Sequence, residues 1–134
     1  MKKSVLLVVL SLLASSSVWA ATTEKLIQTR THWNNQPIQA LHIEQPQVSM
    51  LRITIPVGEK LPMHKHPILN VGYLTKGEFT VVSESGDKLV LKPGDPIVEL
   101  VNTWHYGEST GTEDAEIVVT YVGEQDADLS ELKQ

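Results

Sequence analysis

Two histidines, His64 and His66, stand one residue apart after a turn marked by glycine and proline. Residues i and i+2 of a β-strand point to the same face, so both imidazoles could enter one cavity. Neutral imidazole binds borderline divalent metals well, which makes the pair a candidate chelate. Taken alone the pattern is weak, because Lys65 and the nearby prolines suit an exposed polar turn equally well.

The first twenty residues have the composition of an export signal. Lys2 and Lys3 precede an apolar run over residues 5–13, and small side chains at Val18 and Ala20 fit a cleavage site. A membrane span needs roughly 20 apolar residues, so this run is too short for one. We therefore expect residues 1–20 to be a cleaved signal peptide and the protein to be periplasmic or secreted, with no membrane contact after cleavage.

Composition limits the remaining residues, 21–134, to one domain with a real core. The chain has 16 acidic and 11 basic residues, for a net charge of −5, and loss of the two signal lysines would take it to −7. This balance argues against nucleic-acid binding and favours a soluble protein that handles a small molecule. Cysteine is absent, which excludes thiolate catalysis and Cys-based zinc sites.

Short alternating segments, punctuated by glycine and proline, cover residues 46–123. Residues 48–56 and 115–123 alternate apolar and polar side chains as strands do, and the turn at 85–88 predicts a hairpin. A second turn follows at 92–95. This spacing of short strands predicts an all-β sandwich or barrel.

The two ends of the chain are less regular. Residues 38–43 are expected to form an edge strand. Residues 124–134 are acidic and polar, and predict either a solvated tail or one short C-terminal helix.

The first histidine pair lies within a longer pattern. Gly58, His64, His66 and Gly77 match the spacing G-x5-H-x-H-x3-E-x6-G at every position, with Asn70 in place of the acid. This segment resembles the first conserved motif of the cupin family.

A second pattern begins at Gly94 and resembles the second cupin motif, G-x5-P-x-G-x2-H-x3-N. His105 falls on its histidine, whereas Leu100, Asn102 and Ser109 replace its proline, glycine and asparagine. The resemblance implies a jelly-roll barrel, the double-stranded β-helix. It assigns residues 21–134 to a single cupin domain whose motif-bearing core spans about residues 46–123.

The resemblance also implies that His64, His66 and His105 converge on one divalent metal ion inside the barrel. Imidazole accepts iron, manganese, nickel, copper and zinc, so the identity of the ion stays open. A degenerate, metal-free barrel is the alternative.

Two further residues are candidates for the metal shell. Asn70 could offer only a neutral amide oxygen as a fourth ligand, or it could turn away and cap a loop. Glu99 interrupts an apolar segment, where a buried carboxylate is costly unless it is paired or metal-bound. It could replace the missing acid or orient a ligating imidazole, or it could face outward on an edge strand.

Met63, Tyr73 and Trp104 are candidates to line the mouth of the cavity, with ordinary rim or core packing as the alternative. His32 and His42 match no metal spacing, and we expect them to be exposed or simple core residues.

Three functions fit these features. The first is a metal-dependent oxidoreductase of the dioxygenase kind acting on a small molecule, and the second is a non-catalytic module that binds a metal or small ligand. The third is a structural barrel with vestigial histidines, and whether the protein is an enzyme stays open. We also expect a homodimer, paired through edge strands with residues 31–39 in contact.

Overall fold

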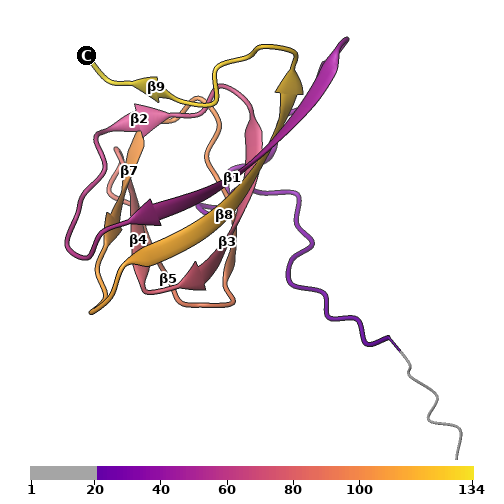
Figure 1. Ribbon diagram of the computed structural model, residues 1–134. Helices are drawn as coiled ribbons and strands as arrows, with labels where there is room; N and C mark the ends of the chain where they lie inside the picture. Colours follow the sequence, from indigo (N-terminus) through magenta and orange to yellow (C-terminus); the bar gives the residue numbers. More distant parts are fainter. Residues whose placement is uncertain (1–20) are drawn as a thin grey trace, which may run out of the picture.

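Two antiparallel sheets face each other in the computed structural model, which describes residues 21–134 (Figure 1). The predicted signal peptide, residues 1–20, lies outside the described residues. The first sheet has the strand order β1-β8-β3-β6, and the second has the order β5-β4-β7-β2-β9. The strands are β1 (Pro46–Ile55), β2 (His64–Lys65), β3 (Leu69–Lys76), β4 (Phe79–Ser83), β5 (Lys88–Leu91), β6 (Pro96–Val98), β7 (His105–Ser109), β8 (Ala115–Glu124) and β9 (Glu131–Leu132). This all-β jelly-roll arrangement confirms the predicted fold class.

The longest pairing joins β1 to β8 over ten residues, from Pro46 opposite Glu124 to Ile55 opposite Ala115. The alternation of β8 turns Ile117, Val119 and Tyr121 into the interior, where all three are buried. The inner side chains of both sheets form one core, as the alternation predicted. Its buried members are Ile55, Leu74, Phe79, Val81, Leu91, Ile97, Ala115, Ile117, Val119 and Tyr121.

The turn residues of both motifs have the positive φ angles that glycine at these positions would allow. Gly77 has φ +74°, and a Cβ there would lie 2.6 Å from the carbonyl oxygen of Asp114. Asn102 replaces a motif glycine and has φ 52°, a left-handed conformation that asparagine adopts more readily than most residues. The turn of the second motif is therefore preserved although asparagine replaces glycine at position 102.

The N-terminal part differs from the expectation of an edge strand over residues 38–43. This segment has no strand, and the nearby chain pairs only through an isolated bridge between Thr31 and Pro37. The backbone N–H of Trp33 instead donates to the carbonyl oxygen of Val98 at 3.0 Å. The apolar residues of 38–43 line a groove on the barrel rather than join a sheet.

The C-terminal end is a strand, so the alternative of a short helix is wrong. Strand β9 pairs with β2, placing Leu132 opposite His64 and Glu131 opposite Lys65. The edge of β2 offers unpaired backbone groups that an extended chain satisfies and a helix does not. Within residues 21–134 no helix is long and apolar enough to cross a membrane.

Candidate metal centre

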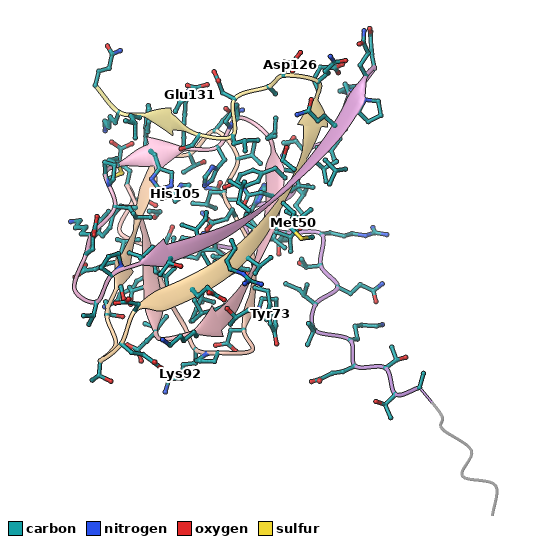
Figure 2. The ribbon with its side chains drawn as sticks, in the orientation of Figure 1. Met50, Tyr73, Lys92, His105, Asp126 and Glu131 are labelled. Atoms are coloured by element: carbon teal, nitrogen blue, oxygen red, sulfur yellow. The ribbon has the colours of Figure 1, made fainter. Side chains whose placement is uncertain are left out.

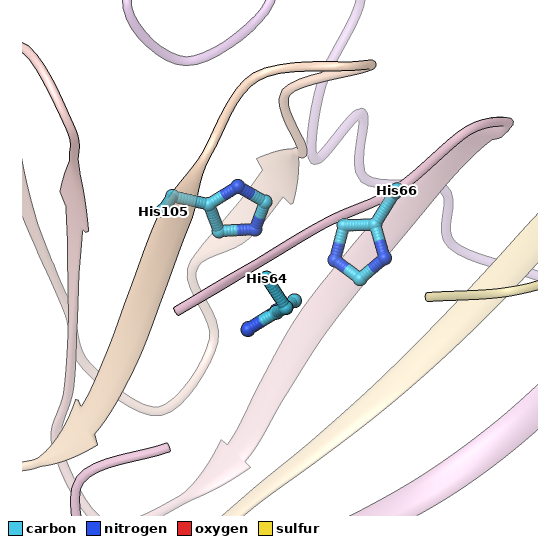
Figure 3. A group of neighbouring side chains, drawn as sticks. All are labelled: His64, His66 and His105. Atoms are coloured by element: carbon cyan, nitrogen blue, oxygen red, sulfur yellow. The ribbon is translucent and has the colours of Figure 1, made fainter. Parts of the chain in front are cut away.

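Three histidines meet inside the barrel, two of them on strands of the second sheet and the third directly after one of those strands (Figure 3). His64 on β2 is the register partner of His105 on β7, and His66 follows directly after β2. Each offers one ring nitrogen, and these atoms lie within 4.8 Å of one another. Figure 2 places His105 in the space between the sheets. The predicted convergence of the three side chains is confirmed.

Each imidazole is held by a backbone carbonyl oxygen that accepts a hydrogen bond from Nδ1. His64 donates to Pro62 at 2.7 Å, His66 to Leu129 at 2.8 Å, and His105 to Thr103 at 2.8 Å. A carbonyl can only accept, so the proton of each neutral ring is on Nδ1 and the lone pair is on Nε2. All three rings are thus fixed in the tautomer that a metal ligand needs.

Burial keeps two of the rings neutral. It lowers the pKa of His66 to about 4, against a smaller raising effect of the hydrogen bond to Leu129 and a further lowering by His64. Burial likewise lowers the pKa of His105 to about 4, with the Thr103 hydrogen bond opposing it and His64 and His66 adding to it. At neutral pH both Nε2 lone pairs are therefore available to a cation.

A cavity of about 50 Å³ adjoins the histidines. Its polar lining consists of the three imidazoles with Asn70, Glu99 and Tyr121, and the other lining residues are apolar or glycine. A larger groove of about 650 Å³ lies between residues 36–43 and residues 67–69, 101–102 and 122–124. That groove contains none of the three histidines, so the chemistry belongs to the smaller cavity.

Glu99 follows β6 and turns into the cavity instead of facing outward. It is 7% exposed, and its Oε2 lies 3.5 Å from Nε2 of His105. Burial raises the pKa of Glu99 to about 7, against a lowering hydrogen bond from the Leu100 backbone. Since burial also keeps His105 neutral, this contact is not an ion pair at neutral pH.

Asn70 also faces the cavity and does not cap a loop. It is 1% exposed, and neither atom of its side-chain amide has a hydrogen-bond partner within residues 21–134. The same holds for Oε2 of Glu99 and Nε2 of His105. Unpartnered buried polar atoms are uncommon in proteins, and four of the six among the described residues belong to Asn70, Glu99 and His105, which line this cavity. Three fixed Nε2 lone pairs beside unpartnered oxygens fit a bound divalent cation.

Met63, Tyr73 and Trp104, the candidates for the mouth of the cavity, are not among the residues that line it, which leaves ordinary packing, the alternative considered for them. Tyr73 alternates on β3 with its buried neighbours and so points the other way, whereas Met63 lies just before β2. Tyr73 lies between buried Gly72 and Leu74, and Trp104 precedes His105. The Trp104 ring faces the Lys65 ammonium at 5.2 Å.

Two supporting residues were not identified from the sequence. The ring of His32, which is buried, donates from Nδ1 to the carbonyl oxygen of Glu99 at 2.6 Å. Leu129 supplies the carbonyl that fixes His66. His42, by contrast, is exposed. Tyr121, on the buried face of β8, also lines the cavity, and the sequence did not single it out as a site residue. Its pKa is raised to about 12 by burial and, secondarily, by Glu99.

Solved structures with the same fold include several enzymes. A DMSP lyase, DddQ, from Ruegeria pomeroyi has a TM-score of 0.57 at 20% identity, over 64% of this chain and 43% of its own. An oxalate oxidase in complex with glycolate has a TM-score of 0.50 at 27% identity, over 55% of this chain and 41% of its own. A cupin 2 conserved barrel domain protein from Leptotrichia buccalis has a TM-score of 0.52 at 25% identity, over 59% of this chain and 37% of its own.

The chain thus spans less than half the length of these structures. A search of curated proteins found no significant match. The family model described as a cupin domain matches residues 51–121, which is more than half of the 134 residues. That match includes all three converging histidines, Asn70 and Glu99. The chain belongs to the cupin domain family.

Proposed function

We propose that this protein is a metal-binding cupin that holds one divalent transition-metal ion through Nε2 of His64, His66 and His105. The observation that carries the proposal is the set of three Nδ1 hydrogen bonds to backbone carbonyls. They orient three imidazole rings toward one point before any ion arrives. Such preorganisation lowers the cost of assembling a metal site.

The donor set favours a transition metal over calcium or magnesium. Imidazole nitrogen suits iron, manganese, nickel, copper and zinc, whereas calcium and magnesium prefer oxygen. A bound redox-active ion would supply electron transfer, and a redox-inert ion would act as a Lewis acid. Three protein ligands leave positions open, as a catalytic site requires.

The chain's own residues would then control access and protons. His64 is half-buried while His66 and His105 are buried, so the centre is reached from the side of His64. The apolar walls exclude bulk water, and Glu99 can hold a proton on a carboxyl oxygen near neutral pH. These features support a metal-dependent oxidoreductase of the dioxygenase kind.

The size of the cavity restricts the substrate. About 50 Å³ accommodates a few water molecules, far below the roughly 300–1,000 Å³ of a typical drug-sized site. The oxalate oxidase similarity, at 27% identity, makes oxalate and other small carboxylates the first substrates to test. The same small volume favours a second candidate, a module that binds the ion and a small anion without turnover.

Export to the periplasm or medium and homodimer formation stay predictions.

Metal analysis of the full chain tests the proposal. We expect close to one transition-metal ion per chain by mass spectrometry after reconstitution. His105→Ala should abolish this binding, and His42→Ala is the matched control because His42 is exposed. A wild-type protein that stays metal-free would refute the proposal. Oxygen uptake or loss of oxalate by the loaded protein would then separate the enzyme from the binding module.

A further inference from the structure

We infer that Glu99 supplies the carboxylate ligand of the metal centre, from the strand end that lies beside Asn70. This inference rests on the proposed function and adds a fourth protein ligand to it. Its starting point is the position of the Glu99 side chain, which lines the same cavity as the three histidines.

The separation of Glu99 from His105 suits two ligands of one ion. Oε2 of Glu99 lies 3.5 Å from Nε2 of His105. Ligand atoms about 2.1 Å from a common ion, at a tetrahedral angle, lie roughly 3.4 Å apart. Both atoms lack a hydrogen-bond partner among the described residues, so their lone pairs remain free for a cation.

Burial gives a second reason. Glu99 is 7% exposed, and a carboxylate removed from water is costly unless it is paired or bound to a metal. The residues that line the cavity with Glu99 include no lysine or arginine that could pair with its carboxylate. A divalent ion held by the histidines would compensate the carboxylate charge.

Two hydrogen bonds fix the backbone of Glu99, and one of them places it next to Asn70. Its N–H donates to the carbonyl oxygen of Asn70 at 3.2 Å, and its own carbonyl oxygen accepts from His32 at 2.6 Å. Asn70, which is uncharged, faces the same cavity. A carboxylate at either of these adjacent positions could therefore reach the ion, and this chain carries it at position 99.

Zinc affinity, measured on the full chain by competition with a chromophoric chelator, tests the inference. Glu99→Gln keeps the size of the side chain and its neutral polarity but cannot carry charge. We expect it to weaken Zn²⁺ binding at least tenfold, in line with roughly 10–100-fold for lost supporting groups. Glu108→Gln, a change of the same type on the outward face of β7, should stay within twofold of wild type.

The exchange Asn70→Glu with Glu99→Gln provides an independent check. If the centre needs a carboxylate at this place, the double variant should regain most of the affinity that Glu99→Gln loses. Affinity of Glu99→Gln within twofold of wild type would overturn the inference, because a neutral side chain would then suffice. If His105→Ala still abolished binding in that case, the proposed three-histidine site would stand alone. Should Glu99→Gln fail to fold, a folded double variant without Zn²⁺ affinity would overturn the inference.

Discussion

His64 and His105 face each other across the antiparallel pairing of β2 and β7, with their ring centroids 4.6 Å apart. Strand β2 has only two residues, so His64 is held in place by its neighbours on both sides. β7 pairs with it on one side, and Leu132 of β9 pairs with it on the other. The geometry of the centre therefore depends on the C-terminal strand as well as on the two motifs.

The buried histidines should make the metal-free protein less stable in mild acid. The folded-state pKa of His105 is about 4, below its ordinary value of 6.5, so the unfolded chain binds more protons between these values. The free energy of unfolding should fall as the pH is lowered from 6.5 to 4, by up to about 1.4 kcal/mol per pH unit for each such group. Urea unfolding of the metal-free protein at several pH values measures this slope.

His105→Gln should reduce that slope, because it removes one of the two groups. His42→Gln should leave it unchanged, since His42 is exposed. An unaltered slope in His105→Gln would contradict the assignment of a buried neutral imidazole.

Glu99 should act in the opposite direction. Its folded-state pKa is about 7, above its ordinary value of 4.5, so the folded protein binds more protons in this range. Its contribution is fully present below pH 4.5 and is lost as the pH rises through 7. As the pH rises from 4.5 to 7, the free energy of unfolding of metal-free Glu99→Gln should therefore increase relative to that of the wild type. The same urea series measures this difference, with Glu108→Gln as the control, and a difference that stays flat with pH would exclude a buried carboxyl.

The convergence of the three histidines could be predicted in two steps. The i, i+2 spacing of His64 and His66 predicted a shared face, whereas the resemblance to the second cupin motif implied that His105 joins them, as its pairing with His64 confirms. The inward positions of Ile117, Val119 and Tyr121 follow from the same alternation. At Asn102, where the residue differs from the motif glycine, the left-handed backbone conformation is preserved.

The supporting contacts could not be predicted because they join distant segments through backbone atoms. Leu129 fixes His66 from 63 residues away, and His32 reaches the carbonyl of Glu99 across 67 residues. A carbonyl oxygen is present in every residue, so no side-chain pattern marks the one that is used. The direction of Glu99 depended on the strand register at the end of β6, which one residue of slip would reverse.

His32 should stabilise the fold and the position of Glu99 together. His32→Ala leaves the buried carbonyl of Glu99 without its donor, which costs about 1–3 kcal/mol. We expect a matching loss in the free energy of unfolding and weaker Zn²⁺ binding, because the chain at Glu99 is released. His42→Ala, the exposed counterpart, should change neither quantity by more than about 0.5 kcal/mol. Equal effects of the two substitutions would show that the His32 hydrogen bond contributes nothing specific.

Phe79 and Gly107 should behave as one packing unit in the wall of the cavity. A Cβ on Gly107 would lie 2.0 Å from Cζ of the Phe79 ring, so the two residues fit only because glycine has no side chain. Gly107→Ala should cost about 1–3 kcal/mol of unfolding free energy, since the ring cannot move in a packed core without strain.

Phe79→Leu removes ring atoms from this contact and leaves a void, so it should be destabilising by itself. In the double variant the new methyl group would occupy part of that void. A double-mutant cycle by urea unfolding should therefore give less destabilisation than the sum of the single variants, with a coupling of about 0.5–3 kcal/mol. Additive effects would contradict direct packing. The three converging histidines provide an internal check, because we expect folded variants to keep whatever Zn²⁺ affinity the wild type has.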